Sequence, residues 1–102
     1  MKEWTIEEWK HTSQKANIAA YYLYTPMCGT CQVASKMLDV VEELLPNVEL
    51  GKANLNYVET LAVEQEIESV PCLLIAKNGQ IQEKIYAFHS VTYLYDQLRK
   101  SI

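Results

Sequence analysis

The chain has 102 residues, of which 49% are hydrophobic and 22% are charged, and its net charge is −4 at pH 7. This length and composition are those of a single globular domain over residues 1–102 that buries a core without a disulfide framework. The negative charge argues against nucleic acid and anionic membrane as partners, and an odd number of cysteines, three, is not typical of a secreted disulfide scaffold.

The N-terminal segment gives no sign of a targeting sequence, because it is polar and charged and lacks the apolar core of a signal peptide. The apolar run nearest to it, Ile18 to Tyr24, is far too short to span a bilayer. We therefore expect a cytoplasmic protein without a membrane segment. In that compartment exposed thiols rest in the reduced state.

The first two elements of the chain are predicted to be a helix and a strand. Thr5 followed by Glu8 resembles the capping box of a helix that runs to about residue 16. The run from Ile18 to Tyr24 has the nearly continuous apolar pattern of a buried strand. This strand leads directly into the cysteine pair.

Beyond the cysteine pair, apolar residues at helical spacing predict a second helix that Pro46 ends. Its predicted inner face consists of Val33, Met37, Val40, Val41 and Leu44. Residues 48–54 are a second strand candidate. Asn56 with Glu59 is the predicted cap of a third helix. The inner face of that helix is expected to hold Val58, Leu61, Ala62 and Ile67.

A hairpin and a last helix complete the chain. Residues 73–77 and 80–87 flank Asn78-Gly79, a strong signal for a two-residue hairpin turn. Ser90 is the predicted cap of the last helix. The apolar positions of that helix are Val91, Leu94, Tyr95, Leu98 and Ile102.

The order of these elements predicts an α/β fold with a mixed sheet of about four strands flanked by helices. The right-handed crossover rule makes the first two strands parallel, and the hairpin is antiparallel. In the strand at 80–87, Ile81 and Ile85 alternate with polar residues, but Glu83 is expected on their side of the pleat. This pattern suits an edge strand with one end in water.

The segment Cys28-Gly29-Thr30-Cys31 carries the chemistry of the chain. Two thiols three positions apart come together where the backbone is tightly curved, as at the start of a helix. There the unpaired N–H groups and the positive end of the helix dipole stabilise a thiolate. A disulfide across four residues constrains the unfolded chain by only about 2 kcal/mol, so the pair suits a reversible switch better than a structural staple.

The order strand, Cys-Gly-Thr-Cys, helix, strand, helix, Val-Pro, hairpin and helix resembles the thioredoxin family over nearly the whole chain. Lys52 lies nineteen residues before Pro71, at the spacing of a lysine that thioredoxins carry near their site. The Asn78-Gly79 hairpin also lies where theirs does. Together these features are a more specific signal than Cys-x-x-Cys alone.

The resemblance implies roles for the residues of the motif. Cys28 is expected to be the exposed nucleophile and Cys31 the buried resolving thiol, with Lys52 taking part in proton transfer. Pro71 is expected to follow a cis peptide bond that faces the two sulfurs. The substrate chain is expected to pair with the backbone of Val70 and to lie against Gly29, Thr30 and Pro71.

Several positions depart from the family pattern. Met27 stands where thioredoxins have a Trp, Thr30 where they have a Pro, and Tyr22 where they have a buried Asp. Cys72 stands where a Thr usually follows the cis proline, and the first strand of the full fold is expected to be missing. A phenol is a poor base at neutral pH, so deprotonation of Cys31 relies on solvent or on Lys52, or is slower.

The leading hypothesis is a thioredoxin-like enzyme that reduces disulfides of proteins or of low-molecular-weight thiols, with no cofactor of its own and no metal. A thioredoxin-reductase-type flavoprotein is the expected electron donor. One alternative is a non-catalytic redox sensor or adaptor. Another is a metal site in which Cys72 joins Cys28 and Cys31. Cys72 can equally be a small buried residue of a strand, where free cysteine is common.

Overall fold

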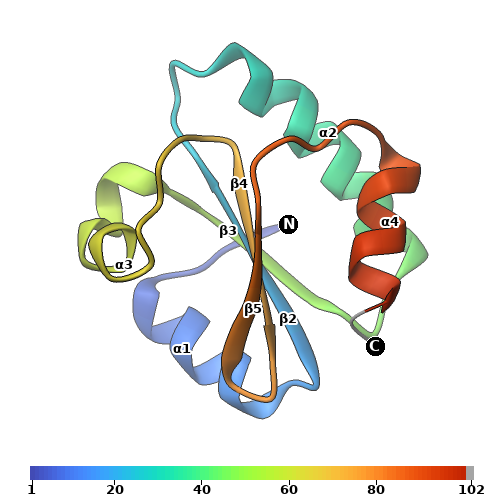
Figure 1. The fold of residues 1–102 in the computed structure, drawn as a ribbon, viewed down its shortest axis with the longest axis horizontal. Coiled ribbons are helices and arrows are strands. Elements are labelled where there is room, and N and C mark those ends of the chain that lie inside the picture. Colours follow the sequence, from blue (N-terminus) through green and yellow to red (C-terminus); the bar gives the residue numbers. More distant parts are fainter. Residues whose placement is uncertain (101–102) are drawn as a thin grey trace.

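The computed structural model describes residues 1–100. In chain order its elements are β1 (Lys2–Glu3), α1 (Ile6–Lys15), β2 (Ile18–Tyr24), α2 (Gly29–Leu44), β3 (Glu49–Asn54), the 3-10 helix η1 (Leu55–Tyr57), α3 (Glu59–Glu64), β4 (Cys72–Lys77), β5 (Gln80–Ile85) and α4 (Val91–Lys100) (Figure 1). Within these residues no helix is long and apolar enough to cross a membrane.

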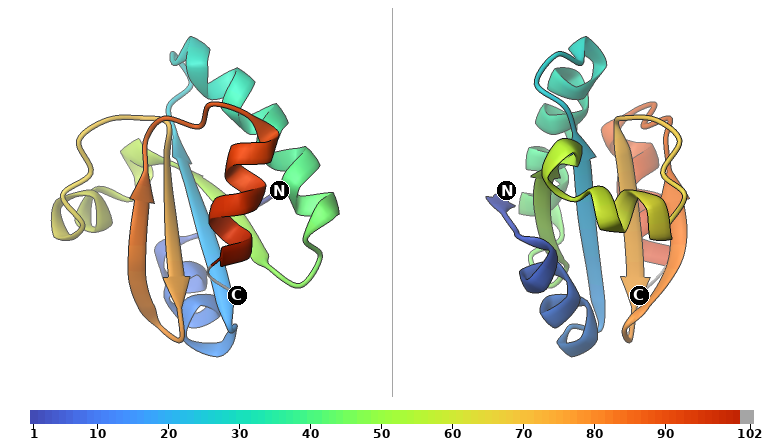
Figure 2. Two further views of the ribbon diagram at one scale, coloured as in Figure 1. Left: turned by 45° about the vertical axis from the view of Figure 1, so that its right-hand side comes forward. Right: turned by 90° about the vertical axis from the view of Figure 1, so that its left-hand side faces the viewer.

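The strands form one mixed sheet in the order β1-β3-β2-β4-β5. β2 runs parallel to β3, and β4 runs antiparallel to both β2 and β5. Helices α2 and α4 cover one face, and α1 and α3 cover the other (Figures 1 and 2). Both faces of β2 are buried, which explains its continuous apolar sequence. The predicted α/β fold and the mixed sheet are confirmed.

The predicted absence of a first strand is wrong, and the sheet has five strands rather than about four. Lys2 and Glu3 form a short edge strand, in parallel register with Gly51 and Lys52 of β3. Two exposed residues carry no periodic apolar pattern, so only their pairing with β3 defines them as a strand. The N–H of Trp4 extends this contact by donating to the carbonyl of Lys52 at 2.9 Å.

Trp4 anchors the N-terminal segment in the core between the sheet and α1. Its ring stacks on Trp9, with 6.4 Å between centroids, and Trp9 stacks on Tyr21 at 4.9 Å. Gly51 makes this packing possible, because a Cβ atom at that position would overlap the Trp4 ring. The Tyr21 hydroxyl donates to the Trp4 carbonyl at 2.6 Å and closes the contact.

The predicted inner face of α2 is wrong by about one residue. Of the predicted residues only Val41 is fully buried, whereas Val33 is 56% exposed and Val40 and Leu44 are also exposed. The residues of α2 that contact the sheet are instead Cys31, Ala34, Leu38 and Val41. Two apolar stripes run along this helix, one from Cys31 and one from Val33, and they are separated by about 100° around the helix axis. The stripe that begins with the small residues Cys31 and Ala34 is the one that packs on Tyr22.

The predicted cap of α3 is also wrong, while the other local signals are confirmed. The Asn54 side chain accepts the N–H of Asn56 at 3.0 Å and opens η1, and Val58 begins α3 without a side-chain cap. Thr5 and Glu8 form both hydrogen bonds of the capping box. Asn78 and Gly79 have φ angles of 53° and 84°, as a two-residue hairpin turn requires.

The last helix begins as predicted and buries two of its apolar positions. The Ser90 hydroxyl accepts the N–H of Tyr93 at 3.0 Å. Leu94 and Leu98 are fully buried against the sheet, and Val91 and Tyr95 are partly buried. Ile102 lies outside the described residues.

The edge strand β5 contains a bulge that the alternating pattern did not predict. Glu83 pairs with Ile75, but Ala76 pairs with Ile81, so the register shifts by one residue between them. Ile85 therefore packs in the core under α2 and α4, whereas Ile81 packs on the opposite face. Glu83 lies on the same face of the sheet as Ile85 and not on that of Ile81. Its carboxylate lies 3.8 Å from the Lys100 ammonium.

The close approach of Trp4 to Gly51 can be tested by stability measurements. Substitution of Gly51 by Ala forces the indole ring out of its stack. We expect the free energy of unfolding in urea to fall by about 1–3 kcal/mol. The matched control is Gly29→Ala, since a Cβ atom there meets nothing within 4 Å. We expect that control to change stability by less than about 0.5 kcal/mol. Equal effects at the two positions would contradict this account of the packing.

Candidate active site

Cys28 and Cys31 form a disulfide at the N-terminus of α2, with 5.2 Å between their Cα atoms. Cys28 is the N-cap residue and is half-buried, whereas Cys31, in the first turn, is only 3% exposed. The loop after β2 is closed by the N–H of Cys28, which donates to the carbonyl of Thr25 at 3.3 Å. The two sulfurs therefore differ in access, and an incoming reactant meets Cys28 first.

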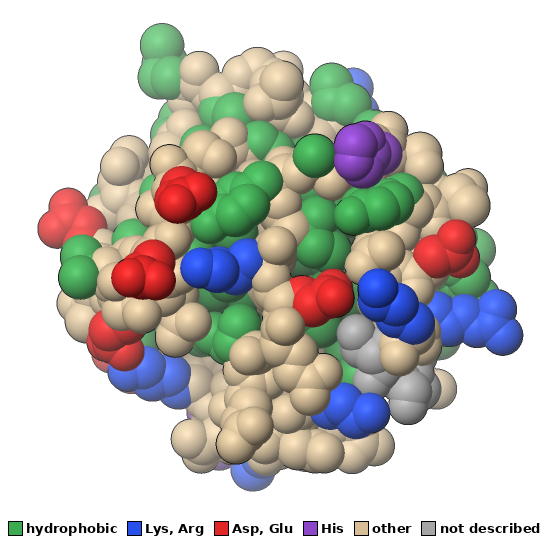
Figure 3. Space-filling model, in the orientation of Figure 1, with side chains coloured by type: hydrophobic (Ala, Val, Ile, Leu, Met, Phe, Trp, Pro, Cys, Tyr) green, Lys and Arg blue, Asp and Glu red, His purple; other side chains and the backbone are tan. Residues whose placement is uncertain are grey.

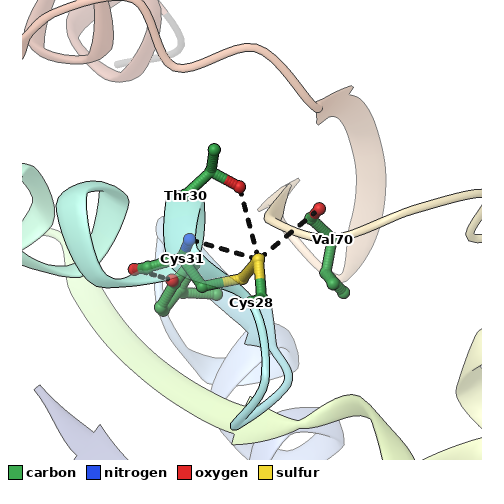
Figure 4. Close-up of a disulfide and its surroundings, with 5 residues drawn as sticks. Cys28, Thr30, Cys31 and Val70 are labelled. Atoms are coloured by element: carbon green, nitrogen blue, oxygen red, sulfur yellow. Dashed lines mark hydrogen bonds between the residues drawn. A yellow bond between two sulfur atoms is a disulfide. The ribbon is translucent and has the colours of Figure 1, made fainter.

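Three polar groups surround the Cys28 sulfur (Figure 4). The N–H of Cys31 donates to Sγ at 3.2 Å, and the Thr30 hydroxyl lies 3.3 Å from it. The carbonyl oxygen of Val70, across the site, lies 3.9 Å away. After reduction, the N–H and the hydroxyl are both placed to donate to a thiolate. Such donors stabilise the thiolate, which is the nucleophilic form of the group.

Tyr22 connects β2 to the buried cysteine. Its hydroxyl donates to the carbonyl of Cys31 at 2.6 Å, and its ring stacks on Tyr24 and contacts Phe88. Burial raises the pKa of Tyr22 to about 12, with a smaller contribution from the Tyr24 hydroxyl. The phenol is thus neutral at physiological pH and already donates its proton to a backbone oxygen. It holds the first turn of α2 in place and offers Cys31 no base.

Lys52 lies on the same side of the disulfide as Tyr24. The Lys52 ammonium is 5.9 Å from the centre of the Tyr24 ring. The Tyr24 hydroxyl donates to the Glu3 carboxylate. Partial burial, with a smaller contribution from this hydrogen bond, raises the pKa of Tyr24 to about 12. Lys52 and Tyr24 both line a hollow of about 410 Å³ whose wall also contains Cys28 and Cys31.

On the other side of the disulfide lies an apolar groove. The peptide bond between Val70 and Pro71 is cis, and Pro71 forms part of a hollow of about 350 Å³. The residues that line it are Thr30, Val33, Ala34, Met37, Pro71, Tyr86, Ala87, Phe88 and His89. Figure 3 shows hydrophobic side chains gathered beside a histidine on this part of the surface. The strand predicted at 80–87 ends at Ile85, and residues 86–89 form a loop without a local motif that would predict this groove.

Three further residues near the site were missed although the sequence contains a signal for them. Gln32, Ser35 and Lys36 line the hollow that contains the two cysteines. Gln32 follows Cys28 by four residues and Ser35 follows Cys31 by four, so a helix that starts at the cysteine pair places them on one face.

Cys72 is separated from the other two thiols. It is fully buried in the core between the sheet and helices α1 and α3, whereas Cys31 lies on α2, which covers the opposite face. Burial raises the pKa of Cys72 to about 12, although the Lys84 charge acts in the opposite direction. Within residues 1–100 no three side chains of His, Cys, Asp or Glu come together as metal ligands.

Comparisons with known proteins identify relatives over almost the whole chain. The family model described as Thioredoxin matches residues 1–100. The chain is 50% identical over 100 residues to Thioredoxin-like protein YusE of Bacillus subtilis, in a match that covers 98% of this chain and 92% of that protein. It is 29% identical over 85 residues to a Thioredoxin H-type of Ricinus communis, over 79% of this chain and 72% of that protein.

Solved structures share the fold at low sequence identity. A mutant thioredoxin from Halobacterium salinarum has a TM-score of 0.89 at 17% identity, over 99% of this chain and 88% of that one. Mitochondrial thioredoxin 3 of Saccharomyces cerevisiae in its oxidised form has a TM-score of 0.88 at 21% identity, over 98% of this chain and 94% of that one.

The contact between Thr30 and the Cys28 sulfur leads to a prediction for the reduced protein. Thr30→Val keeps the shape of the side chain but removes the hydroxyl donor. We expect alkylation of Cys28 by iodoacetamide at pH 7 to slow by about threefold to tenfold, since less of the thiol is ionised. Mass spectrometry of the alkylated peptide over a range of pH gives the rate and the thiol pKa.

The control is Thr30→Ser, which keeps the hydroxyl and should react within about twofold of the unsubstituted protein. Equal rates in the valine and serine variants would show that the hydroxyl does not stabilise the thiolate.

The buried phenols and the Cys72 thiol predict a loss of stability at alkaline pH. Folding raises the pKa of Cys72 from 9.0 to about 12, raises those of Tyr22 and Tyr24 from 10.0 to about 12, and also raises that of Tyr21. Because the unfolded chain ionises first, the stabilisation is complete below pH 9 and is lost as the pH rises toward 12.

We therefore expect the free energy of unfolding in urea to fall steadily from about pH 9 upward. In Cys72→Ala the fall should begin about one pH unit later, since only the tyrosines then contribute. A flat profile between about pH 8 and 11 would contradict the burial of these groups.

Proposed function

The chain belongs to the thioredoxin family, and from this we propose how its thiol–disulfide oxidoreductase activity is carried out. The proposal depends above all on one observation. The half-exposed Cys28 sulfur caps α2 and is bonded to the buried Cys31, and the Cys31 N–H donates to it at 3.2 Å. In this arrangement one sulfur can be attacked or can attack, while the other is kept for the second step.

In the first step the Cys28 thiolate attacks one sulfur of a substrate disulfide. A mixed disulfide forms between Cys28 and that sulfur, and the other substrate sulfur leaves as a thiolate and takes up a proton. In the second step the Cys31 thiolate attacks Cys28 Sγ. The substrate sulfur is released, and the two electrons now reside on the reduced product while Cys28 and Cys31 are oxidised.

The second step needs Cys31 to lose its proton. The carboxylate of the family pattern is replaced by Tyr22, whose phenol is neutral and donates to the Cys31 carbonyl. We assign this proton to water in the hollow of about 410 Å³, with Lys52 as the nearby group that can relay it. This makes resolution of the mixed disulfide the slower of the two steps.

Protein disulfides are the proposed main substrates. The carbonyl of Val70, 3.9 Å from the Cys28 sulfur, is suited to pair with the backbone of a substrate chain next to Pro71. The apolar groove beside Pro71 suits the side chains of that substrate. A flavoprotein of the thioredoxin-reductase type is the proposed electron donor, and the cytoplasm is the proposed location, because a reducing compartment regenerates the dithiol.

A non-catalytic redox sensor is the second candidate function. The observation that favours it is that Tyr22, a neutral phenol that donates to the Cys31 carbonyl, occupies the position of the family carboxylate. A sensor would change its binding to a partner when the disulfide closes, without sustained turnover by a reductase. Steady-state turnover of insulin disulfides with a thioredoxin reductase and NADPH distinguishes the enzyme from the sensor.

The roles of the two cysteines predict opposite outcomes for the serine variants. Cys28→Ser should abolish turnover, since the attacking sulfur is lost. Cys31→Ser should form mixed disulfides with substrates that persist until a reducing agent is added, because no second thiol resolves them.

Non-reducing electrophoresis followed by mass spectrometry identifies these adducts, and Cys72→Ala serves as the control that retains turnover. Turnover that survives in Cys28→Ser would overturn the assignment of the nucleophile.

A further inference from the structure

The hollow beside the disulfide differs in chemistry from the apolar groove. Its wall is formed by Tyr22, Tyr24, Thr25, Pro26, Cys28, Cys31, Gln32, Ser35, Lys36 and Lys52. The charged side chains among the described residues of this wall are two lysines, Lys36 and Lys52. The Ser35 hydroxyl and the Gln32 amide add hydrogen-bond donors. The volume of about 410 Å³ is in the range of small-molecule sites.

The positive charge of this hollow is not neutralised by ion pairs. The ion pairs among the described residues join the N-terminus to Asp39 and Glu42, and Lys100 to Glu83. Neither lysine of the wall takes part in them.

The carboxylate that neighbours Lys52 in the sheet is engaged by another group. Glu3, which lies beside Lys52 in the sheet, accepts the Tyr24 hydroxyl. The Lys52 ammonium is held over the Tyr24 ring, and the N-terminus of α2 adds partial positive charge. The hollow is therefore suited to an anion.

We propose that this hollow binds low-molecular-weight disulfides that carry carboxylate or phosphate groups and presents them to Cys28. The proposal rests on the disulfide reductase function above and adds a second class of substrate to it. The two sides of the disulfide then serve different substrates. The apolar groove beside Pro71 accepts a peptide, and the cationic hollow accepts a small anion. This contrast exists although the chain as a whole has a net charge of −4.

The reaction at the hollow balances without a further co-reactant. The Cys28 thiolate attacks one sulfur of the anionic disulfide, so that a mixed disulfide forms and one anionic thiol leaves. Cys31 then attacks Cys28 Sγ, and the second anionic thiol leaves. Two thiols are formed, and the protein retains the Cys28–Cys31 disulfide, from which a dithiol donor restores the reduced form.

The experiment compares an anionic and a neutral disulfide on the same reduced protein. Glutathione disulfide carries the negative charge, and hydroxyethyl disulfide carries none. The quantity measured is the ratio of their second-order rate constants for oxidation of the protein. This ratio removes any effect of a substitution on the intrinsic reactivity of Cys28 or on proton transfer.

We expect the ratio to fall by about threefold to tenfold in Lys36→Gln and in Lys52→Gln, and further in the double variant. It should also fall in the unsubstituted protein as salt is raised from about 20 to about 500 mM. The matched control is Lys10→Gln, an exposed lysine of α1, on the opposite face of the sheet, which should leave the ratio unchanged.

Two outcomes would overturn the proposal: a ratio that is unchanged in both wall variants, or an equal fall in Lys10→Gln. An unchanged ratio with a lower rate for both disulfides would mean that the lysines act on the chemistry and not on binding. Failure of the reductase function itself is distinct, since the unsubstituted protein would then fail to react with hydroxyethyl disulfide through Cys28.

Discussion

The position of the first turn of α2 determines the rest of the site. Tyr22 reaches from the central strand to the Cys31 carbonyl, and the small residues below it allow the helix to lie close to the sheet. This contact fixes which cysteine is buried and which is half-exposed. It also rotates α2 so that its second apolar stripe, from Val33 to Leu44, faces outward. Tyr22 therefore positions the helix through its hydrogen bond, and its neutral phenol supplies no base to Cys31.

The parts of the fold that depend on short-range chemistry could be predicted from the sequence, and those that depend on a distant partner could not. The capping box at Thr5, the turn at Asn78-Gly79 and the cap at Ser90 each use residues a few positions apart. The two-residue strand at the N-terminus exists only through β3, which is distant in the sequence. The bulge in β5 depends likewise on its register with β4.

The same distinction holds for the site. The cysteine pair and the cis proline could be located because their spacing matches a known family. The groove residues 86–89 could not, since their importance depends on how a loop and a helix come together beside the disulfide. That assembly gives one sulfur pair two unlike surroundings, apolar on one side and cationic on the other. Among the described residues the two linings have no member in common, so a substitution can change one of them without altering the other.

The bulge in β5 has a consequence for association between chains. An exposed sheet edge with regular backbone is a template on which another strand can add, and repeated addition leads to aggregates. Here one edge is only two residues long, and the other is interrupted after Ile81 and carries the exposed Lys84. Both edges are thus poor templates. The sheet therefore resists permanent pairing with another chain through either edge.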